Sequence, residues 1–512
     1  MTDFTKGRNK IFAGVDSIDA SNVVAVVNRA MSIHKTNQQE IQWLFNLYRG
    51  SDDRIIKRSR NIENGINNKA FVSYYSLIAD VKSGLFTQNS LSLVSRQSDE
   101  QKAKDIEQLI TYFDLTNKHM LDKEAALQAA ICGVAYRFVG IDPYFNKNTR
   151  NGHAPFKVST LAPENVFMIW GDDTDTEPLA AVYMYQLPNE DVKPSKPTGE
   201  TGQLETINAY KVYTPTHTYS WTDSTVDDLE TSKALSWGIP IVEYRLNSFY
   251  IGLYERVTSL IYMLSILRSD GVNAVVQYVG SLLFGRNIGV PEPINPQDDA
   301  ETKKAKEEVI AEFKQGIKNG SIFVEDTKEK PASLEYIAQN LNQADTQVLY
   351  EAIIDDIVSI TQIPRSALSM GASGNNGAAE TSSGWTNAVV DAQNSEPFWF
   401  AAARKELFIE LEVCKKAESL ENVFVDDVVF AMTRESFSNK QSEVQAFAML
   451  VEKGVPWAEA AKIASITTDP ENLASKMKHW REQEEKRLAN NQSVHSTIVQ
   501  DEPAAQENEE QN

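Results

Sequence analysis

The sequence Ile360-Thr-Gln-Ile-Pro364 leads into the glycine-rich stretch Gly371-Ala-Ser-Gly-Asn-Asn-Gly-Ala378, which is followed by Ser383-Gly-Trp385. Three glycines within seven residues give this backbone access to many conformations. Apolar spacing predicts a long helix that ends near Ile363 and another that opens at Ser383 and runs past Asp391. An uncharged loop held between two long helices suits a segment that must slide past another molecule.

Composition limits the class of protein. With 512 residues, the chain is too long for one hydrophobic core, so roughly two to four structural units are expected. Its 42% hydrophobic and 24% charged residues are typical of a folded globular protein. No apolar signal sequence or membrane-length window is visible. Cys132 and Cys414 lie in apolar helical contexts, and we expect buried free thiols in a cytosolic chain.

The net charge is −21, from 50 basic and 71 acidic residues. DNA binding depends on Lys and Arg neutralising phosphates, so the general surface of this chain should not hold DNA tightly. Two interpretations remain open: the acidity gives solubility alone, or it makes a surface that DNA passes without sticking.

Before the loop, the periodicity predicts helices, then strands. Capping sequences at Thr36 and Ser98 open two helices, and Gly133 closes a third that starts at Lys118. The period then changes to two, which predicts an antiparallel unit. Its expected strands are Val134–Ile141, Val166–Trp170, Leu179–Gln186, Ile207–Tyr213, His217–Trp221 and Ile239–Arg245.

Two long helices bracket a compact insert. One carries an apolar stripe from Leu253 to Leu267, and the other carries one from Leu349 to Ile360. We expect these helices to pack side by side and to hold the insert at one end. Within the insert the patterns predict a charged helix and two short strands, at Asp298–Lys318, Ser321–Asp326 and Ser333–Ala338.

After the loop, a helix is expected from Trp385 to Lys416, with a kink or break at Pro397. Trp385 and Phe398-Trp-Phe400 fit either a stacking platform for bases or core or subunit contacts, and helical spacing favours core or subunit contacts. Three helices should follow, near 439–453, 456–465 and 470–489. The acidic remainder lacks Lys and Arg and is expected to be disordered.

No motif indicates an enzyme. The glycine stretch lacks the lysine of a phosphate-binding loop, since Ala378-Ala-Glu380 follows Gly377. Carboxylates at Asp172, Asp173 and Asp175 suit a divalent cation, but they lack the full calcium-loop spacing, and a hairpin turn is favoured. The six histidines show no metal-ligand spacing. We expect no catalytic residue, no cofactor and no metal.

Several fragments carry a family resemblance through their order. They are Asn46-Leu-Tyr-Arg-Gly50, Gly238-Ile-Pro-Ile-Val-Glu-Tyr244 followed by Asn247, Glu255 to Asp270, Ser383-Gly384 before a long helix, and Gly454 to Glu471. Over roughly residues 36 to 490, the chain resembles the portal (head-to-tail connector) proteins of tailed bacteriophages, in their long-tailed-phage form. It departs from the family in having a single Asn247 after Arg245-Leu246, where two Asn residues are frequent, and in its extended glycine loop.

The resemblance implies an α+β, mainly helical portal fold, with a β-rich wing, a two-helix stem, a small α/β clip, a kinked long helix and a helical crown. It also implies a cyclic ring of twelve subunits around a channel. The implied divisions are an N-terminal arm (1–35), the wing (36–246), stem helix 1 (247–276), the clip (277–338), stem helix 2 (339–363), the tunnel loop (364–384), the kinked long helix and return to the wing (385–432), the crown (433–490) and a disordered acidic tail (491–512).

The implied function is to form the ring-shaped DNA channel at one capsid vertex, through which DNA is packaged and ejected without sequence specificity. The portal itself hydrolyses nothing. The implied partners are other copies of the chain, double-stranded DNA, the terminase motor, head-completion or adaptor proteins, and the major capsid and scaffolding proteins, with no membrane. The implied location is the virion, after assembly in the host cytoplasm.

The resemblance also assigns residues to two surfaces. The tunnel loop that faces DNA would comprise Ser369, Met370, Gly371, Ala372, Ser373, Gly374, Asn375, Asn376 and Gly377. The clip surface that docks the motor or adaptor would comprise Asp298, Lys303, Lys304, Glu307 and Lys318. Two alternatives stay open: a phage structural adaptor or scaffold that forms no channel, and a metal-dependent hydrolase that uses the three aspartates from Asp172 to Asp175.

Overall fold

The chain divides into two compact units. The larger unit comprises residues 1–50, 73–258 and 354–512, and the smaller comprises 51–72 and 259–353. The computed structural model describes residues 7–59, 67–96, 100–149, 152–172, 174, 177–188, 206–223, 229–279, 282–286, 291–318, 333–337, 343–368, 375–432, 440–464, 476–484 and 486–487.

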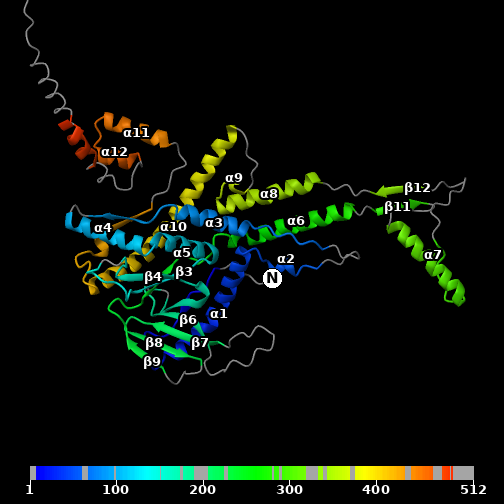
Figure 1. The fold of residues 1–512 in the computed structure, drawn as a ribbon, viewed down its shortest axis with the longest axis horizontal. Coiled ribbons are helices and arrows are strands. Elements are labelled where there is room, and N and C mark those ends of the chain that lie inside the picture. The colour runs from blue at the N-terminus through cyan, green and yellow to red at the C-terminus, as the bar shows by residue number, and fades with distance from the viewer. Residues whose placement is uncertain are drawn as a thin grey trace, which may run out of the picture. The chain divides into compact units, whose positions relative to one another are not determined.

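The larger unit mixes helices and strands (Figure 1). Its helices are α1 (Val23–Tyr48), α3 (Tyr74–Phe86), α4 (Glu100–Leu115), α5 (Lys118–Cys132), the end of α8 (Gln343–Thr361), α9 (Arg365–Leu368), α10 (Asn375–Lys416), α11 (Lys440–Glu452) and α12 (Trp457–Ile463). Its strands are β1 (Ile11–Phe12), β2 (Ser92–Ser95), β3 (Ala135–Ile141), β4 (Phe156–Leu161), β5 (Val166–Trp170), β6 (Ala180–Pro188), β7 (Thr206–Tyr213), β8 (His217–Thr222), β9 (Glu230–Lys233), β10 (Ile241–Tyr244) and β13 (Val428–Ala431).

A six-stranded sheet, in the order β1-β5-β6-β7-β8-β9, forms one half of the core of this unit. Its pairings are antiparallel except for β1 with β5. Helix α1 covers one face, because Val23, Val27 and Ala30 recur at helical spacing and are buried in the same cluster as Ile169 and Val182. Figure 1 shows α1 against this sheet.

A second sheet, in the order β10-β3-β4, lies beside α5 and α10. Helix α5 approaches closely because alanines occupy its buried face, among them Ala125, Ala126 and Ala129. It ends at Gly133, whose φ of +84° places it in the left-handed region that favours glycine. The expected end of this helix and the period-two strands β3, β5, β6, β7, β8 and β10 are therefore confirmed.

Several expected elements are wrong or were missed. The first helix begins at Val23, so the capping sequence at Thr36 lies inside α1, as does the expected arm boundary at residue 35. Helix α3 and strand β4 were not predicted. Cys132 and Cys414 are both buried free thiols, as expected.

The smaller unit contains α2 (Asp53–Ile56), most of α6 (Thr258–Val279), β11 (Leu282–Arg286), α7 (Ala300–Lys318), β12 (Ser333–Ile337) and the start of α8. The charged helix and the second short strand are confirmed by α7 and β12, whereas the partner strand β11 was missed. The expected strand Ser321–Asp326 lies outside the described residues. Arg268 of α6 donates a 3.2 Å hydrogen bond to the Tyr350 hydroxyl of α8, so these helices are neighbours here.

A polar ladder joins residues 68–72 to α6. The backbone N–H of Asn68 donates to Asn273 at 2.7 Å, that of Ala70 to Ser269 at 2.9 Å, and that of Val72 to Ser265 at 3.2 Å. The three acceptors are buried and recur every four residues, so they lie on one face of the helix. Side chains thereby supply the partners that this stretch of backbone needs.

Gly133→Ala tests the close approach at the end of α5. An added Cβ would lie 2.1 Å from the carbonyl oxygen of Tyr250, and the positive φ adds strain. Gly152→Ala is the matched control, because Gly152 has a φ of +78° but nothing within 4 Å of its Cβ. The control should lose only about 1–2 kcal/mol, and Gly133→Ala clearly more, in urea unfolding. Equal losses would contradict this packing.

Candidate functional site

The chain entering the glycine-rich stretch is held in the larger unit as far as Leu368. Helix α8 ends at Thr361, and Gln362 follows in the left-handed region with a φ of +56°. Its N–H donates to the Val358 carbonyl at 2.8 Å, which closes the last turn. Ile363 is then buried just before the short helix α9, and Leu368 is buried as the last residue of α9. The N-terminal flank of the expected tunnel loop is therefore anchored.

The long helix begins earlier than predicted. Helix α10 starts at Asn375, so the predicted start at Ser383 is wrong, and residues 375–384 of the expected loop are helical. Helix α9 occupies part of the expected loop as well. Ser369 to Gly374 lie outside the described residues, and so do the side chains of Asn375, Asn376 and Gly377. A kink or break was predicted at Pro397, and the helix continues through this residue without a break.

Lys82 of α3 joins the two flanks of this segment. Its ammonium donates to the carbonyl of Thr361 at 2.7 Å and pairs with the Asp391 carboxylate at 2.5 Å. Thr361 ends α8, and Asp391 lies on α10, so one buried cation contacts both helices. We call residues 362–390 the channel segment, because they lie between these two contacts and contain the predicted tunnel loop (364–384).

An aromatic contact holds α10 further along. The Trp399 side chain is fully buried and lies between Phe86 of α3, at 5.3 Å between ring centroids, and Tyr244 of β10, at 4.5 Å. Trp399 is thus a core residue, one of the two interpretations, core or subunit contact, that its helical spacing favoured. Ala388 and Ala392 are also buried, so α10 is packed from Ala388 onward.

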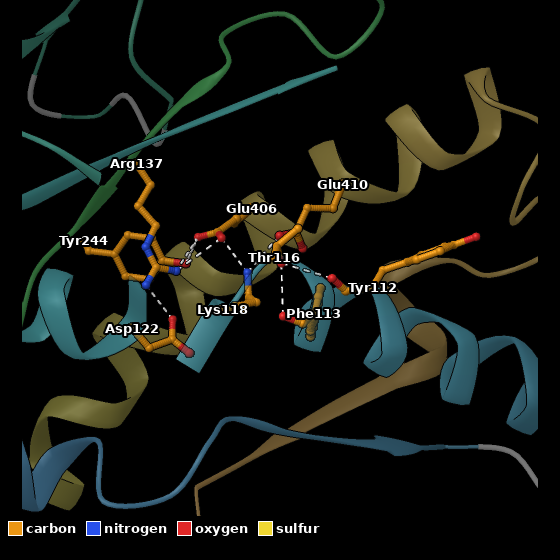
Figure 2. Close-up of polar contacts among 9 residues, drawn as sticks. All are labelled: Tyr112, Phe113, Thr116, Lys118, Asp122, Arg137, Tyr244, Glu406 and Glu410. Atoms are coloured by element: carbon orange, nitrogen blue, oxygen red, sulfur yellow. Dashed lines mark hydrogen bonds and ion pairs between the residues drawn. The ribbon is translucent and has the colours of Figure 1, made fainter. Parts of the chain in front are cut away.

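A buried ion cluster anchors the C-terminal half of α10 (Figure 2). Arg137 of β3 has no exposed surface; it donates to Asp122 of α5 at 2.6 Å and to both carboxylate oxygens of Glu406, at 3.1 and 3.2 Å. The Tyr244 hydroxyl donates a further hydrogen bond to Glu406. Side chains from two strands, β3 and β10, therefore converge on one carboxylate of α10.

Lys118 adds a second cation to the cluster. Its ammonium lies 2.5 Å from Glu406 and 2.8 Å from Glu410, which is one helical turn further along α10. The cluster then holds three carboxylates and two cations. The Glu410 Oε2 atom is buried and has no hydrogen-bond partner among the described residues. A proton on Glu410 would balance the charge.

The two glutamates have opposite pKa shifts. Burial alone would raise the pKa of Glu406, but Arg137 and Lys118 outweigh it and hold the pKa at about 2. For Glu410, burial and the neighbouring Glu406 charge outweigh Lys118 and raise the pKa to about 7. Glu406 is therefore the permanent anion of the cluster, and Glu410 is the member that gains or loses a proton near neutral pH.

Comparison with known proteins decides the family. The model of the family described as "Phage portal protein, SPP1 Gp6-like" matches residues 29–488. The chain belongs to this family. A comparison with curated proteins gives no match. The chain is therefore a phage portal protein, as the order of its sequence fragments indicated, and portal proteins are structural.

The residues predicted for the clip surface lie in the smaller unit, on or just before α7. Lys304 and Glu307 are exposed, whereas Asp298 is half-buried and pairs with Lys306 at 3.0 Å. Lys303 is half-buried and donates to the Pro296 carbonyl at 3.0 Å. Lys318 ends α7, and its side chain is outside the described part. The exposed pair is the better candidate for docking a partner.

Of the three aspartates in the alternative metal site, Asp172 lies within the described residues. Asp172 accepts hydrogen bonds from the backbone and hydroxyl of Thr174, at 2.7 and 2.6 Å, and lies between the paired strands β5 and β6. Asp173 and Asp175 are outside the described residues. Within the described parts of the chain, no group of three possible metal ligands occurs, and no helix has the length and apolar character to cross a membrane.

Sequence reasoning missed Lys82, Arg137 and Glu406. A weak signal existed for two of them, since Arg137 interrupts the apolar strand β3 and the pair Glu406 and Glu410 lies among apolar residues of α10. A charge on a buried face needs a partner. The partners themselves were not predictable, since 269 residues separate Arg137 from Glu406.

Because the two glutamates have opposite pKa shifts, replacing each with neutral glutamine should have opposite effects on stability. The pKa of Glu406 is lowered from its ordinary value of 4.5, so the ionised carboxylate stabilises the fold above pH 4.5. That contribution disappears as the pH falls toward 2. The pKa of Glu410 is raised, so the contribution of its protonated form to stability is complete below pH 4.5 and disappears as the pH rises through 7. Glu406→Gln should cost about 3–5 kcal/mol at pH 7, because Arg137 loses its charged partner.

Glu410→Gln should leave stability unchanged near pH 5 and raise it above pH 7. Thermal unfolding of both variants from pH 5 to 8.5 measures this. Glu255, whose burial raises its pKa to about 7, should leave a residual pH dependence in the Glu410→Gln variant. If Glu410→Gln destabilises the chain at pH 8 as much as Glu406→Gln, the assignment of roles within the cluster is wrong.

Proposed function

We propose that this portal protein forms a closed ring of twelve copies, and that double-stranded DNA passes through its channel during packaging and ejection. The observation that carries the proposal is the family match over residues 29–488. Ring assembly with capsid and packaging partners, at a capsid vertex of the virion, follows from the family. The subunit number, the specific partners and the DNA path are our proposal, as is assembly in the host cytoplasm.

Exposed apolar side chains in the smaller unit support assembly with further copies. Val275 of α6 is 52% exposed, and Val348 of α8 is 67% exposed. Met263, Val276 and Leu349 are also exposed, and of these five residues only Leu349 belongs to a predicted apolar stripe. The exposed side chains therefore lie mostly outside the predicted stripes. A neighbouring copy in a cyclic ring would cover these side chains.

Charge supports passage of DNA without tight binding. Each subunit contributes a net charge of −21, and a ring multiplies that charge. Few phosphate contacts would form in such a channel, so the duplex could move along it with little resistance. We propose that the channel segment faces the DNA, with Ser369 to Gly377 as its contact region.

The clip would dock the other machinery. We propose that the terminase motor binds around α7 during packaging, and that head-completion or adaptor proteins replace it there. The exposed charges of Lys304 and Glu307 support this role. Major capsid and scaffolding proteins would contact the ring during assembly. The portal itself would perform no hydrolysis.

Negative-stain imaging and native mass spectrometry of the purified chain test the ring. We expect rings with a central hole and a mass twelve times that of one chain. Val275→Asp and Val348→Asp should shift the population toward smaller species, because each places a charge where a neighbour would pack. A monodisperse monomer or dimer across protein and salt concentrations would instead favour a structural adaptor without a channel.

Glycine replacement tests the channel segment. Gly371→Ala, Gly374→Ala and Gly377→Ala together should reduce packaging of DNA, because alanine narrows the conformations open to the backbone. At Gly377 it should also favour the helix, by about 1 kcal/mol. Gly84→Ala is the control, since Gly84 lies in α3 with nothing within 4 Å of an added Cβ. The readout is nuclease-protected DNA per ring, and unchanged packaging with intact rings would refute the role.

A further inference from the structure

Lys82 makes contacts that differ from those of an ordinary surface lysine. Its side chain is 9% exposed, and its ammonium contacts one group before the channel segment and one after it. The first is the Thr361 carbonyl at 2.7 Å, and the second is the Asp391 carboxylate at 2.5 Å. Lys82 itself lies in α3, which belongs to neither of these helices.

The chemistry of both contacts favours a cation. Carbonyls in the last turn of a helix have no partner within the helix, and they carry the negative end of its dipole. The carbonyl of Thr361, the last residue of α8, is such a group. An ammonium has three donors, so Lys82 satisfies this carbonyl and the carboxylate of Asp391 at the same time. A cation also matches the negative charge of Asp391, which a neutral donor would leave unbalanced.

The contacts tie the two ends of the channel segment together. Ile363 and Leu368 are buried just inside the first contact, and Ala388 is buried just inside the second. Leu368 and Ala388 are thus buried at the two ends of the backbone that lies between them. The separation of its two ends depends on how α8 and α10 are held at Lys82.

We propose that Lys82 is a positioning residue that fixes the two ends of the channel segment relative to each other. It touches no DNA; it acts through Thr361 and Asp391. The functional consequence rests on the proposed role of this segment in the channel. The geometric role does not, so the two can be tested separately.

Hydrogen exchange on the purified full-length chain measures the geometric role. Lys82→Met keeps the apolar stem and removes the ammonium. We expect amides of residues 375–387 and of Gln362 to exchange about tenfold faster, or more, because a charged hydrogen bond is lost at each end. Lys82→Arg should restore much of the protection, since it keeps a cation that can reach Asp391.

Lys102→Met is the matched control. Lys102 pairs with Asp427 at 2.6 Å in the same unit, and the substitution removes the same chemical group. It should leave exchange in the channel segment unchanged. If Lys82→Met and Lys102→Met speed exchange equally throughout the larger unit, Lys82 acts only on overall stability and the proposal is overturned. Unchanged exchange in Lys82→Met overturns it as well.

The exchanged pair Lys82→Asp with Asp391→Lys separates the two contacts. It restores opposite charges, but an aspartate cannot donate to the Thr361 carbonyl. Recovery of protection in residues 375–387 with continued fast exchange at Gln362 supports the proposal. Packaging is measured in parallel: if Lys82→Met loosens the segment yet packages DNA normally, the positioning role stands and the DNA-facing role of the segment fails.

Discussion

A carboxylate with no exposed surface has to be matched by cations, and Glu406 imposes that constraint on the larger unit. Arg137 and Lys118 reach it from β3 and α5, and Tyr244 reaches it from β10. Burying such a cluster brings little net stability, because desolvation offsets much of the attraction. The cluster instead specifies a single orientation of α10, since no other rotation of this helix about its axis would place both glutamates opposite these partners.

The rest of α10 follows from that fixed rotation. Trp399 lies nearly two turns before Glu406 and meets Phe86, and Asp391 lies further back and meets Lys82. Each contact uses a different interaction, namely an ion cluster, aromatic packing and a single cation. A helix held at successive points along one end can present its other end reproducibly. The DNA-facing role that we propose for the channel segment would require this in every copy of the chain.

Local patterns predicted the elements that local physics determines. Period-two alternation identified the strands around β5 to β8, and Gly133 marked the end of α5 because only a left-handed residue closes it there. The start of α1 was missed, since Asn22 and Asp19 form its entry through short-range side-chain contacts that resemble an ordinary turn. The start of α10 was missed because glycines and serines with low helix propensity occupy its first turns.

The candidate site was predictable only in outline. The glycine-rich stretch stood out by composition, and the order of fragments indicated the portal family. The contacts that hold the segment were beyond reach, because Lys82 and Asp391 are 309 residues apart. The sequence around Lys82 or Asp391 also contains no motif that would single out either residue. Such pairings depend on the folded arrangement of three helices, and a single sequence carries no direct record of them.

In the polar ladder between residues 68–72 and α6, the spacing of the N–H donors along the chain differs slightly from the spacing of the acceptors along the helix. Two residues of extended chain advance roughly 6.6 Å, whereas four residues of helix advance roughly 6 Å. The rungs at Asn273, Ser269 and Ser265 therefore drift by about half an ångström each, and their lengths run from 2.7 to 3.2 Å. Because this mismatch accumulates, donors and acceptors can stay within hydrogen-bond distance for only a few successive pairs. The ladder also tolerates no one-residue insertion, because alternate N–H groups of the extended chain point in opposite directions.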